Sequence, residues 1–340
     1  MLLKGNIITG LFKKYIGNLR SGEIDVDALG SGLMLDEGGR IMAVPSIPNY
    51  SPDKLPYFTT AFDITSNQSI FCKLFGDVIY CVSMTQAGYA AVIKFNIIAN
   101  TWSVVNDTLF ACSGIKICEK SGDKLFIFCN EDTNFIIIDT ANSDAVTYSA
   151  TTARNIMFGV AGESTGAGAI YCFGYSGSDG ICTWYEIATD TWYNGATLTG
   201  VPFYGSGLIY YGMSSILIFR PDTTSDDYNT YLYAVANDEY VLWYPPAIQQ
   251  LTQFKNDRFC YFEYNGLGYI YMELNSVGTL FQIGWNTADL PVLKATFLNN
   301  GKTNAVLYGT KLYIISMSGW RNTTFCGLPN ITVDISVLLT

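Results

Sequence analysis

The most informative chemical feature of the sequence is the absence of histidine among its 340 residues. Without an imidazole, no catalytic triad that depends on histidine can form, and no histidine can bind a metal or titrate near neutral pH. The nine cysteines include no Cys-x-x-Cys pair, and several lie inside apolar runs, as Cys81 and Cys172 do. We therefore expect buried free thiols, a reducing compartment during folding, and neither a metal site nor a cofactor.

Arginines offer the remaining route to catalysis, because a sialidase-type site holds a substrate carboxylate between arginines and adds a Tyr-Glu nucleophile pair and an acid. Four arginines lie near predicted strand boundaries: Arg154, Arg220, Arg258 and Arg321. Residues 176–184 look like the Asp-box of that family, although Asp179 and Gly180 are adjacent where the box separates them. We expect the arginines to pair with neighbouring acids and predict no catalytic residue. A sialidase-like glycosidase is the alternative.

The charge of the chain and its aromatic residues limit the classes of partner that it is expected to bind. The net charge of −10 repels phosphate backbones, so we expect no sequence-specific nucleic-acid binding. The acidic clusters at 222–227 and at Asp36-Glu37 lack the spacing of an EF-hand, and we expect solvated loops there. The six tryptophans mostly follow predicted outer strands and are expected to pack in the core or between blades, with a sugar-binding aromatic platform as the alternative. No apolar run approaches the roughly 18 residues of a membrane span, and we expect neither membrane insertion nor a signal peptide.

Short apolar runs recur along the chain, each followed by a polar turn and a second strand-like segment. Their reference positions are 79, 125, 170, 216, 259 and 312, which gives intervals of 46, 45, 46, 43 and 53 residues. Each run is too short for a buried helix and is rich in β-forming residues. The runs are Val78–Val82, Leu125–Phe128, Ile170–Phe173, Ile216–Phe219, Phe259–Phe262 and Leu312–Ile315.

The period predicts one four-stranded sheet per repeat, with the apolar run as its inner strand. A single sheet of this kind cannot bury both faces, whereas copies stacked around an axis can. We predict an all-β fold, a β-propeller of six blades, or seven if the N-terminal segment forms one. Residues 1–56 form an arm with a hairpin and a Pro-rich linker, and residues 57–340 form the propeller. Residues 57–65 are either an outer strand of the first blade or a strand that pairs with residues 331–339 to close the ring.

Two segments carry a family resemblance. Residues 95–102 and 185–192 place a tryptophan seven positions after an aromatic residue, at Phe95 and Trp102 and at Tyr185 and Trp192. This pattern resembles the tail of the kelch repeat, in which a tight hairpin brings both rings onto one face between blades. Residues 274–281 keep the spacing with weaker residue types. The kelch double glycine after the first strand is replaced, and the copper chemistry found on some kelch propellers is excluded by the missing histidine ligands.

The N-terminal segment resembles the opening of tail nozzle or hub proteins of short-tailed bacteriophages. The matching residues precede Val44-Pro45 and include the candidate assembly contacts Asp36, Glu37, Gly38, Gly39 and Arg40. The resemblance implies a non-enzymatic structural protein of the virion, assembled in the host cytoplasm. Its partners would be portal, adaptor or tail proteins and further copies of itself in a ring, with hexameric symmetry as the implied form. The alternative is a free-standing kelch-type protein-binding or glycan-binding module.

Overall fold

The computed structural model divides the chain into two compact units, Met1–Ser51 with Ser336–Thr340, and Pro52–Ile335. It describes residues 33–35, 41–43, 53–55, 70–85, 87–112, 114–129, 134–150, 155–161, 168–203, 207–210, 215–219, 230–243, 259–274, 277–283, 292–298, 303–316 and 331–338. No helix within these ranges is long and apolar enough to cross a membrane.

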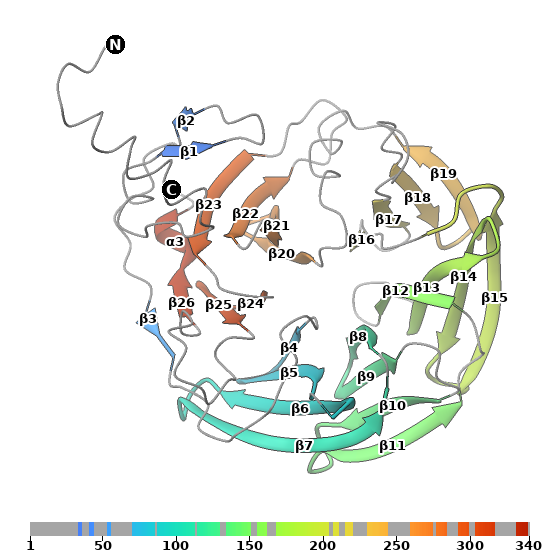
Figure 1. Cartoon of the computed structure of the whole chain (residues 1–340), viewed down its shortest axis with the longest axis horizontal. Coiled ribbons are helices and arrows are strands. Elements are labelled where there is room, and N and C mark those ends of the chain that lie inside the picture. The colour runs from blue at the N-terminus through green and yellow to red at the C-terminus, as the bar shows by residue number, and fades with distance from the viewer. Residues whose placement is uncertain are drawn as a thin grey trace. The chain divides into compact units, whose positions relative to one another are not determined.

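The larger unit contains six antiparallel four-stranded sheets, which confirms the predicted all-β, six-bladed propeller (Figure 1). Blade 1 consists of β4 (Phe71–Phe75), β5 (Val78–Met84), β6 (Tyr89–Asn96) and β7 (Thr101–Ala111). Blade 2 consists of β8 (Ile115–Ser121), β9 (Lys124–Cys129), β10 (Asn134–Asp139) and β11 (Ala145–Ala150). Blade 3 consists of β12 (Asn155–Ala161), β13 (Ala169–Ser176), β14 (Asp179–Glu186) and β15 (Thr191–Leu198).

The second half of the ring repeats this plan. Blade 4 consists of β16 (Gly207–Tyr210), β17 (Ser215–Phe219), β18 (Thr230–Ala234) and β19 (Glu239–Trp243). Blade 5 consists of β20 (Phe259–Tyr264), β21 (Leu267–Leu274), β22 (Val277–Ile283) and β23 (Val292–Leu298). Blade 6 consists of β24 (Thr303–Tyr308), β25 (Lys311–Ser316), β26 (Ile331–Asp334) and β3 (Asp53–Lys54), and α3 (Ile335–Leu338) follows β26.

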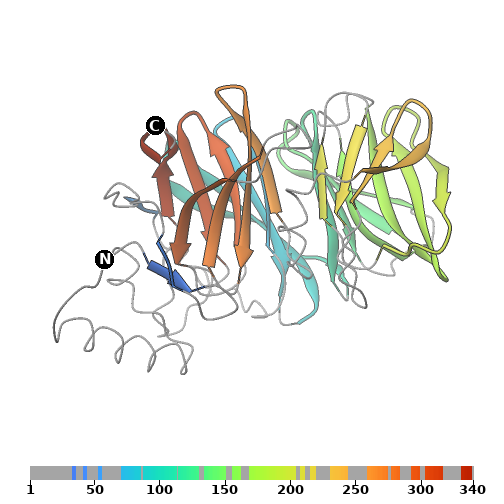
Figure 2. The same cartoon turned by 90° about the horizontal axis from the view of Figure 1, so that it is seen from above.

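The first strands of the blades contact one another all the way round the ring and lie nearest its centre, while the fourth strands form the outer rim (Figure 1). Seen edge-on, the strands run across the thickness of the ring and their turns lie at its two faces (Figure 2). The strand period therefore positions three distinct regions: the axis, the two turn-bearing faces and the rim.

From the sequence we expected the apolar runs to be the inner strands of the blades. The structure shows that most of them are not. In five blades they are the second strand, which has sheet neighbours on both edges and an adjacent blade on each face. A strand covered in this way is apolar without interruption, as the burial of nearly all of β5 and β13 shows. In blade 5 the run Phe259–Phe262 belongs to the first strand, and the equivalent strand is β21. The intervals of 43 and 53 residues, which both use position 259, therefore compared unlike strands.

The ring is closed by pairing between distant parts of the chain. β26 pairs with β3, with Ile331 opposite Lys54 and Thr332 opposite Asp53. One N-terminal strand thus completes a blade built otherwise from C-terminal strands. Residues 53–54, which we assigned to the linker, belong to this sheet. The segment 57–65, which we considered for closure, lies outside the described residues.

The smaller unit contains the predicted hairpin. β1 (Leu33–Leu35) pairs antiparallel with β2 (Ile41–Ala43), with Met34 opposite Met42. The connecting residues, which hold the Gly-Gly pair, lie outside the described ranges.

The core consists of apolar clusters between successive blades. Ile79 and Phe95 of blade 1 pack with Tyr313 and Ile315 of blade 6, and comparable clusters join blades 1 and 2, 2 and 3, and 3 and 4. Each large side chain buried in this way contributes about 1.5–3 kcal/mol. Cys72, Cys81, Cys172 and Cys182 belong to these clusters as free thiols, in agreement with the sequence prediction.

Candidate functional site

An aspartate in the turn between the third and fourth strands links blade 3 to blade 2. Asp190 adopts the left-handed conformation, with φ of 51°, which aspartate tolerates better than most residues. Its Oδ1 accepts hydrogen bonds from the hydroxyls of Tyr185 in its own blade at 2.7 Å and Ser149 in blade 2 at 2.8 Å. These two bonds, from Tyr185 first and Ser149 second, lower the pKa of Asp190.

Blade 4 repeats the arrangement at Asp238, again with φ of 51°. Its Oδ1 accepts hydrogen bonds from the hydroxyl of Tyr233 at 2.5 Å and from the backbone N–H of Ala196 in blade 3 at 2.7 Å. Tyr and Asp are five residues apart in both blades. Burial raises the pKa of Tyr233, and the nearby Cys182 and Asp238 raise it further, so the phenol remains a donor. We use the word latch for an aspartate in the turn between the third and fourth strands together with the hydrogen bond that its side chain forms to a neighbouring blade.

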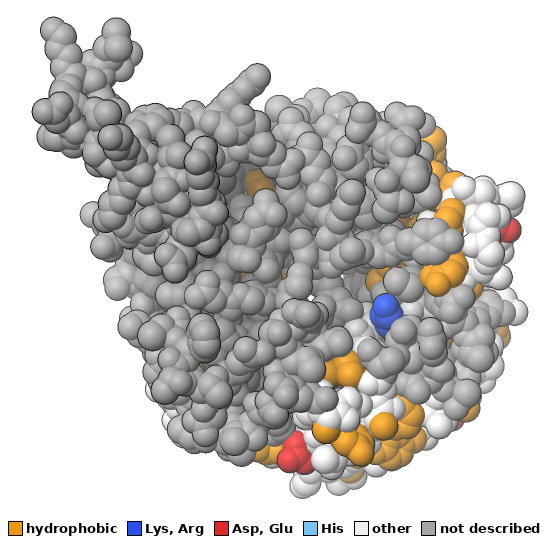
Figure 3. Space-filling view, in the orientation of Figure 1, with side chains coloured by type: hydrophobic (Ala, Val, Ile, Leu, Met, Phe, Trp, Pro, Cys, Tyr) orange, Lys and Arg blue, Asp and Glu red, His pale blue; other side chains and the backbone are white. Residues whose placement is uncertain are grey.

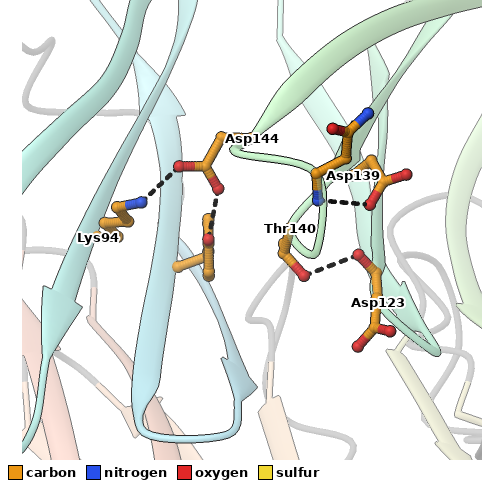
Figure 4. Close-up of polar contacts among 7 residues, drawn as sticks. Lys94, Asp123, Asp139, Thr140 and Asp144 are labelled. Atoms are coloured by element: carbon orange, nitrogen blue, oxygen red, sulfur yellow. Dashed lines mark hydrogen bonds and ion pairs between the residues drawn. The ribbon is translucent and has the colours of Figure 1, made fainter.

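Blade 2 has a charged form of the latch (Figure 4). Asp144, with φ of 60°, accepts a hydrogen bond from the hydroxyl of Tyr80 at 2.5 Å and forms an ion pair with Lys94, both in blade 1. Thr140 donates to the backbone oxygen of Asp123 at 2.7 Å in the neighbouring turn. The turn is thus held within its own blade while its aspartate reaches the preceding one.

The aromatic residues singled out from the sequence meet as cross-strand pairs. Phe95 lies opposite Trp102 with ring centroids 4.8 Å apart, and Tyr185 lies opposite Trp192 at 5.4 Å. Both pairs pack against the preceding blade, and the indole N–H of Trp192 donates to the backbone oxygen of Ala150 at 2.9 Å. Their positions are those of structural side chains between blades.

Blade 4 contains a third such pair that we did not identify from the sequence. Tyr233 lies opposite Tyr240, with the same spacing of seven residues and a tyrosine in place of the tryptophan. Accepting tyrosine at the second position would have revealed it. The weaker match over 274–281 does not form such a pair, because Leu274 lies opposite Val277 and Phe281 opposite Leu293.

A row of stacked rings crosses blade 3 and reaches the surface. Tyr171 lies opposite Trp184 at 5.8 Å, and Trp184 opposite Tyr193 at 5.5 Å, with interplanar angles of 30° and 17°. Exposure rises along the row, from buried Tyr171 to exposed Tyr193. The hydroxyl of Tyr193 donates to Oε2 of Glu186 at 3.3 Å, so the exposed ring has a carboxylate beside it.

An ion pair lies near the axis, between the first strands of blades 1 and 2. Nζ of Lys73 is 2.8 Å from Oε2 of Glu119, and the side chains are 29% and 16% exposed. Burial by itself lowers the pKa of Lys73, but attraction to Glu119 outweighs it and the pKa is raised. Burial raises the pKa of Glu119, an effect that Lys73 offsets only in part. Burial also raises the pKa of nearby Cys260 to about 12, so this thiol is protonated near neutral pH.

Exposed apolar side chains gather on the outermost strands of four successive blades. They are Val104 on β7, Tyr148 on β11, Tyr193 on β15, and Val241 and Leu242 on β19. Figure 3 shows hydrophobic side chains along the edge of the molecule where β11, β15 and β19 lie. We call this set the apolar rim. The other exposed large apolar side chains among the described residues, Tyr89, Ile98 and Leu267, do not lie on fourth strands.

Other residues singled out from the sequence fall outside the described ranges. These are Asp36, Glu37, Gly38, Gly39 and Arg40, the arginines Arg154, Arg220, Arg258 and Arg321, and the acidic cluster at 222–227. Asp179 of the segment that looks like an Asp-box is described. Its Oδ1 accepts a hydrogen bond from the N–H of Gly200 at 2.8 Å and joins two turns of blade 3. Within the described residues, no group of histidine, cysteine and acidic side chains could hold a metal ion.

The fold and these sites define a six-bladed β-propeller whose turn aspartates join its blades. No protein-family model matches the sequence, and no curated protein sequence matches it. The structure is similar to SapL1 lectin in complex with alpha methyl fucoside, with a TM-score of 0.55 and 9% identity over 79% of this chain and 97% of the lectin.

Two further similarities involve other proteins. Trypanosoma rangeli sialidase matches with a TM-score of 0.55 and 10% identity over 90% of this chain and 58% of the sialidase, so this chain spans little more than half of that enzyme. YjhT matches with a TM-score of 0.51 and 9% identity over 82% of this chain and 95% of that protein. At these identities the likenesses show the fold alone.

Proposed function

We propose that this propeller is a non-enzymatic assembly protein that docks other proteins on its apolar rim. The rim itself carries this proposal, since Tyr148 is 53% exposed and Val241 45% exposed on strands that face outward. Groups of exposed apolar side chains are typical of sites where proteins associate. Four blades contribute to the rim, so a partner contacts a broad surface rather than one loop.

The latches support this role by making the ring a rigid frame. Asp144, Asp190 and Asp238 each use a carboxylate oxygen to join two blades. A charged acceptor forms stronger hydrogen bonds than a neutral one, and each latch spans two separate sheets. A frame of this kind presents the rim residues in fixed positions, which lowers the entropy lost when a partner binds.

In its specific form, the proposal places the protein in the short tail of a bacteriophage virion. Support comes from the N-terminal resemblance to nozzle or hub proteins at residues 35–40 and 44–45, and from the diverged kelch-type repeat. Partners would then be portal, adaptor or tail proteins and other copies in a ring. A net charge of −10 would not retain DNA that passes along the tail axis.

The test is quantitative mass spectrometry of purified virus particles produced by the genome that encodes this chain. We expect the chain in fixed proportion to the portal protein. Changing Tyr148→Ser together with Val104→Ser should lower incorporation, while Leu267→Ser, at an exposed residue off the rim, should not. Absence from the particles would contradict the virion role, and incorporation unaffected by the rim change would contradict docking on the rim.

Glycan binding is the second candidate, favoured by the row of rings that ends at exposed Tyr193 beside Glu186. An aromatic face next to a carboxylate provides both an apolar platform and a hydrogen-bond acceptor for sugar hydroxyls. The lectin among the similar structures makes this candidate worth testing. A glycan array should show binding that Tyr193→Ala abolishes and Tyr148→Ala leaves unchanged. An array without signal would leave the assembly role as the better account.

A further inference from the structure

The outermost strand of blade 4, β19, has the sequence Glu-Tyr-Val-Leu-Trp. It pairs on one side only, with β18, through five consecutive residue pairs without a register shift. Its other edge therefore presents a regular row of backbone N–H and C=O groups. Such an edge is a template for pairing with another strand unless something obstructs it.

The other outermost strands are obstructed in identifiable ways. The pairing of β7, β15 and β23 with their third strands contains register shifts, which bend an edge away from regular pairing. β11 is regular, but its Ala150 carbonyl accepts the indole N–H of Trp192 from blade 3. β3 has two residues.

The side chains of β19 also suit an additional partner. Val241 and Leu242 are neighbours in sequence, so they point to opposite faces of the sheet, yet they are 45% and 41% exposed. Each face of the strand thus carries a partly exposed apolar side chain at the rim. β19 contains one charged residue, Glu239, at its first position, and the remaining residues have high β propensity.

The strand is complementary to itself in the antiparallel direction. Pairing about a two-fold axis at Val241 places this residue opposite its counterpart, Tyr240 opposite Leu242, and Glu239 opposite Trp243. The two glutamates are then about 14 Å apart along the strands, beyond the range of strong repulsion at physiological ionic strength. Parallel in-register pairing would instead place them about 4.8 Å apart. Two copies of an acidic chain repel each other, and this repulsion is weakest where the contacting surface carries little charge, as β19 does.

We propose that two copies of this chain associate through β19, so that the two fourth blades form one continuous antiparallel sheet. This contact is isologous, because the same edge serves both copies. It extends the proposed assembly role by naming one partner and one strand, and it does not depend on the virion role. Other proteins can occupy the rest of the rim while β19 is paired.

The first experiment is sedimentation equilibrium of the full chain over a wide concentration range, with Val241→Lys and Leu267→Lys as variants. The two residues are matched in exposure, at 45% and 44%, but Leu267 lies off the outer rim. We expect the wild type and Leu267→Lys to approach twice the chain mass of 37.5 kDa. Val241→Lys should weaken dimerisation at least about tenfold, because a lysine obstructs strand addition. Circular dichroism would verify that both variants fold.

The second experiment does not depend on a variant. Amide hydrogen exchange of the wild type at low and high concentration should show protection of β19 that increases with concentration, while β7 stays unchanged. A wild type that remains monomeric at all concentrations would overturn the inference, as would a dimer unaffected by Val241→Lys. A monomer that still enters purified particles would refute the β19 contact and leave the assembly role intact.

Discussion

Replacing Asp238 tests whether the latches hold neighbouring blades together. The side chain accepts hydrogen bonds from the Tyr233 hydroxyl at 2.5 Å and the Ala196 N–H at 2.7 Å, and its backbone has φ of 51°. Bonds to a charged acceptor contribute about 1.5–3 kcal/mol each when buried. Because Asp238 is exposed, water competes for the same donors, and the lower end of that range applies.

Three substitutions separate the contributions. Asp238→Gly loses both bonds but tolerates the positive φ, and should lower the free energy of unfolding by about 2–3 kcal/mol. Asp238→Ala adds about 1 kcal/mol of backbone strain, giving about 3–4 kcal/mol. Asp238→Asn keeps one acceptor oxygen and tolerates the conformation, and should lose about 1 kcal/mol. The expected order of destabilisation is therefore Ala, Gly, Asn.

Urea unfolding, monitored by tryptophan fluorescence, measures these differences in the free energy of unfolding. The variants are compared with one shared m value, the slope of that free energy against urea concentration. Asp107→Ala, at an exposed aspartate on β7, is the matched control and should change stability by less than about 0.5 kcal/mol. Equal effects of alanine and glycine would show that the backbone conformation does not matter. Effects of all three variants no larger than the control would refute the latch.

Three further predictions concern other parts of the ring. Hydrogen bonds lower the pKa of Asp190, so this carboxylate stabilises the fold above its unfolded-state pKa and loses that effect as the pH falls. When the urea midpoint is measured between pH 7 and 3, it should therefore decrease less steeply towards acid pH in Asp190→Asn than in the wild type. A Cβ on Gly180 would lie 2.6 Å from a phenylalanine ring carbon, so Gly180→Ala should lower the thermal midpoint by the equivalent of about 1–3 kcal/mol, whereas Gly114→Ala, in open space, should not. Lys73→Met should destabilise the fold more than the double variant that also carries Glu119→Leu, because the single change leaves a partly buried carboxylate without its partner. A double-mutant cycle measured by urea unfolding tests this, and additive losses of stability would contradict it.

The sequence by itself determined the class of fold. Its intervals of 45 and 46 residues reflect strands whose pairing is local, since each blade except the last is built from consecutive strands. The spacing of seven between Phe95 and Trp102 and between Tyr185 and Trp192 reflects a hairpin, which is also local. The second strands are apolar throughout, so they were the easiest to find, but the pattern alone could not show that another strand lies between them and the axis.

Only the tertiary structure decided how the blades are joined. In the latches of blades 3 and 4 the Tyr and Asp are five residues apart. Asp190 also bonds Ser149 in blade 2, however, and Asp238 bonds Ala196 in blade 3, and neither partner has a local signal. Closure by β3 and β26 joins opposite ends of the propeller unit. The exposure of β19 likewise depends on which strands become edges and which neighbours cover them. Strand periodicity is a property of local sequence, whereas latches, closure and edges arise from packing between blades.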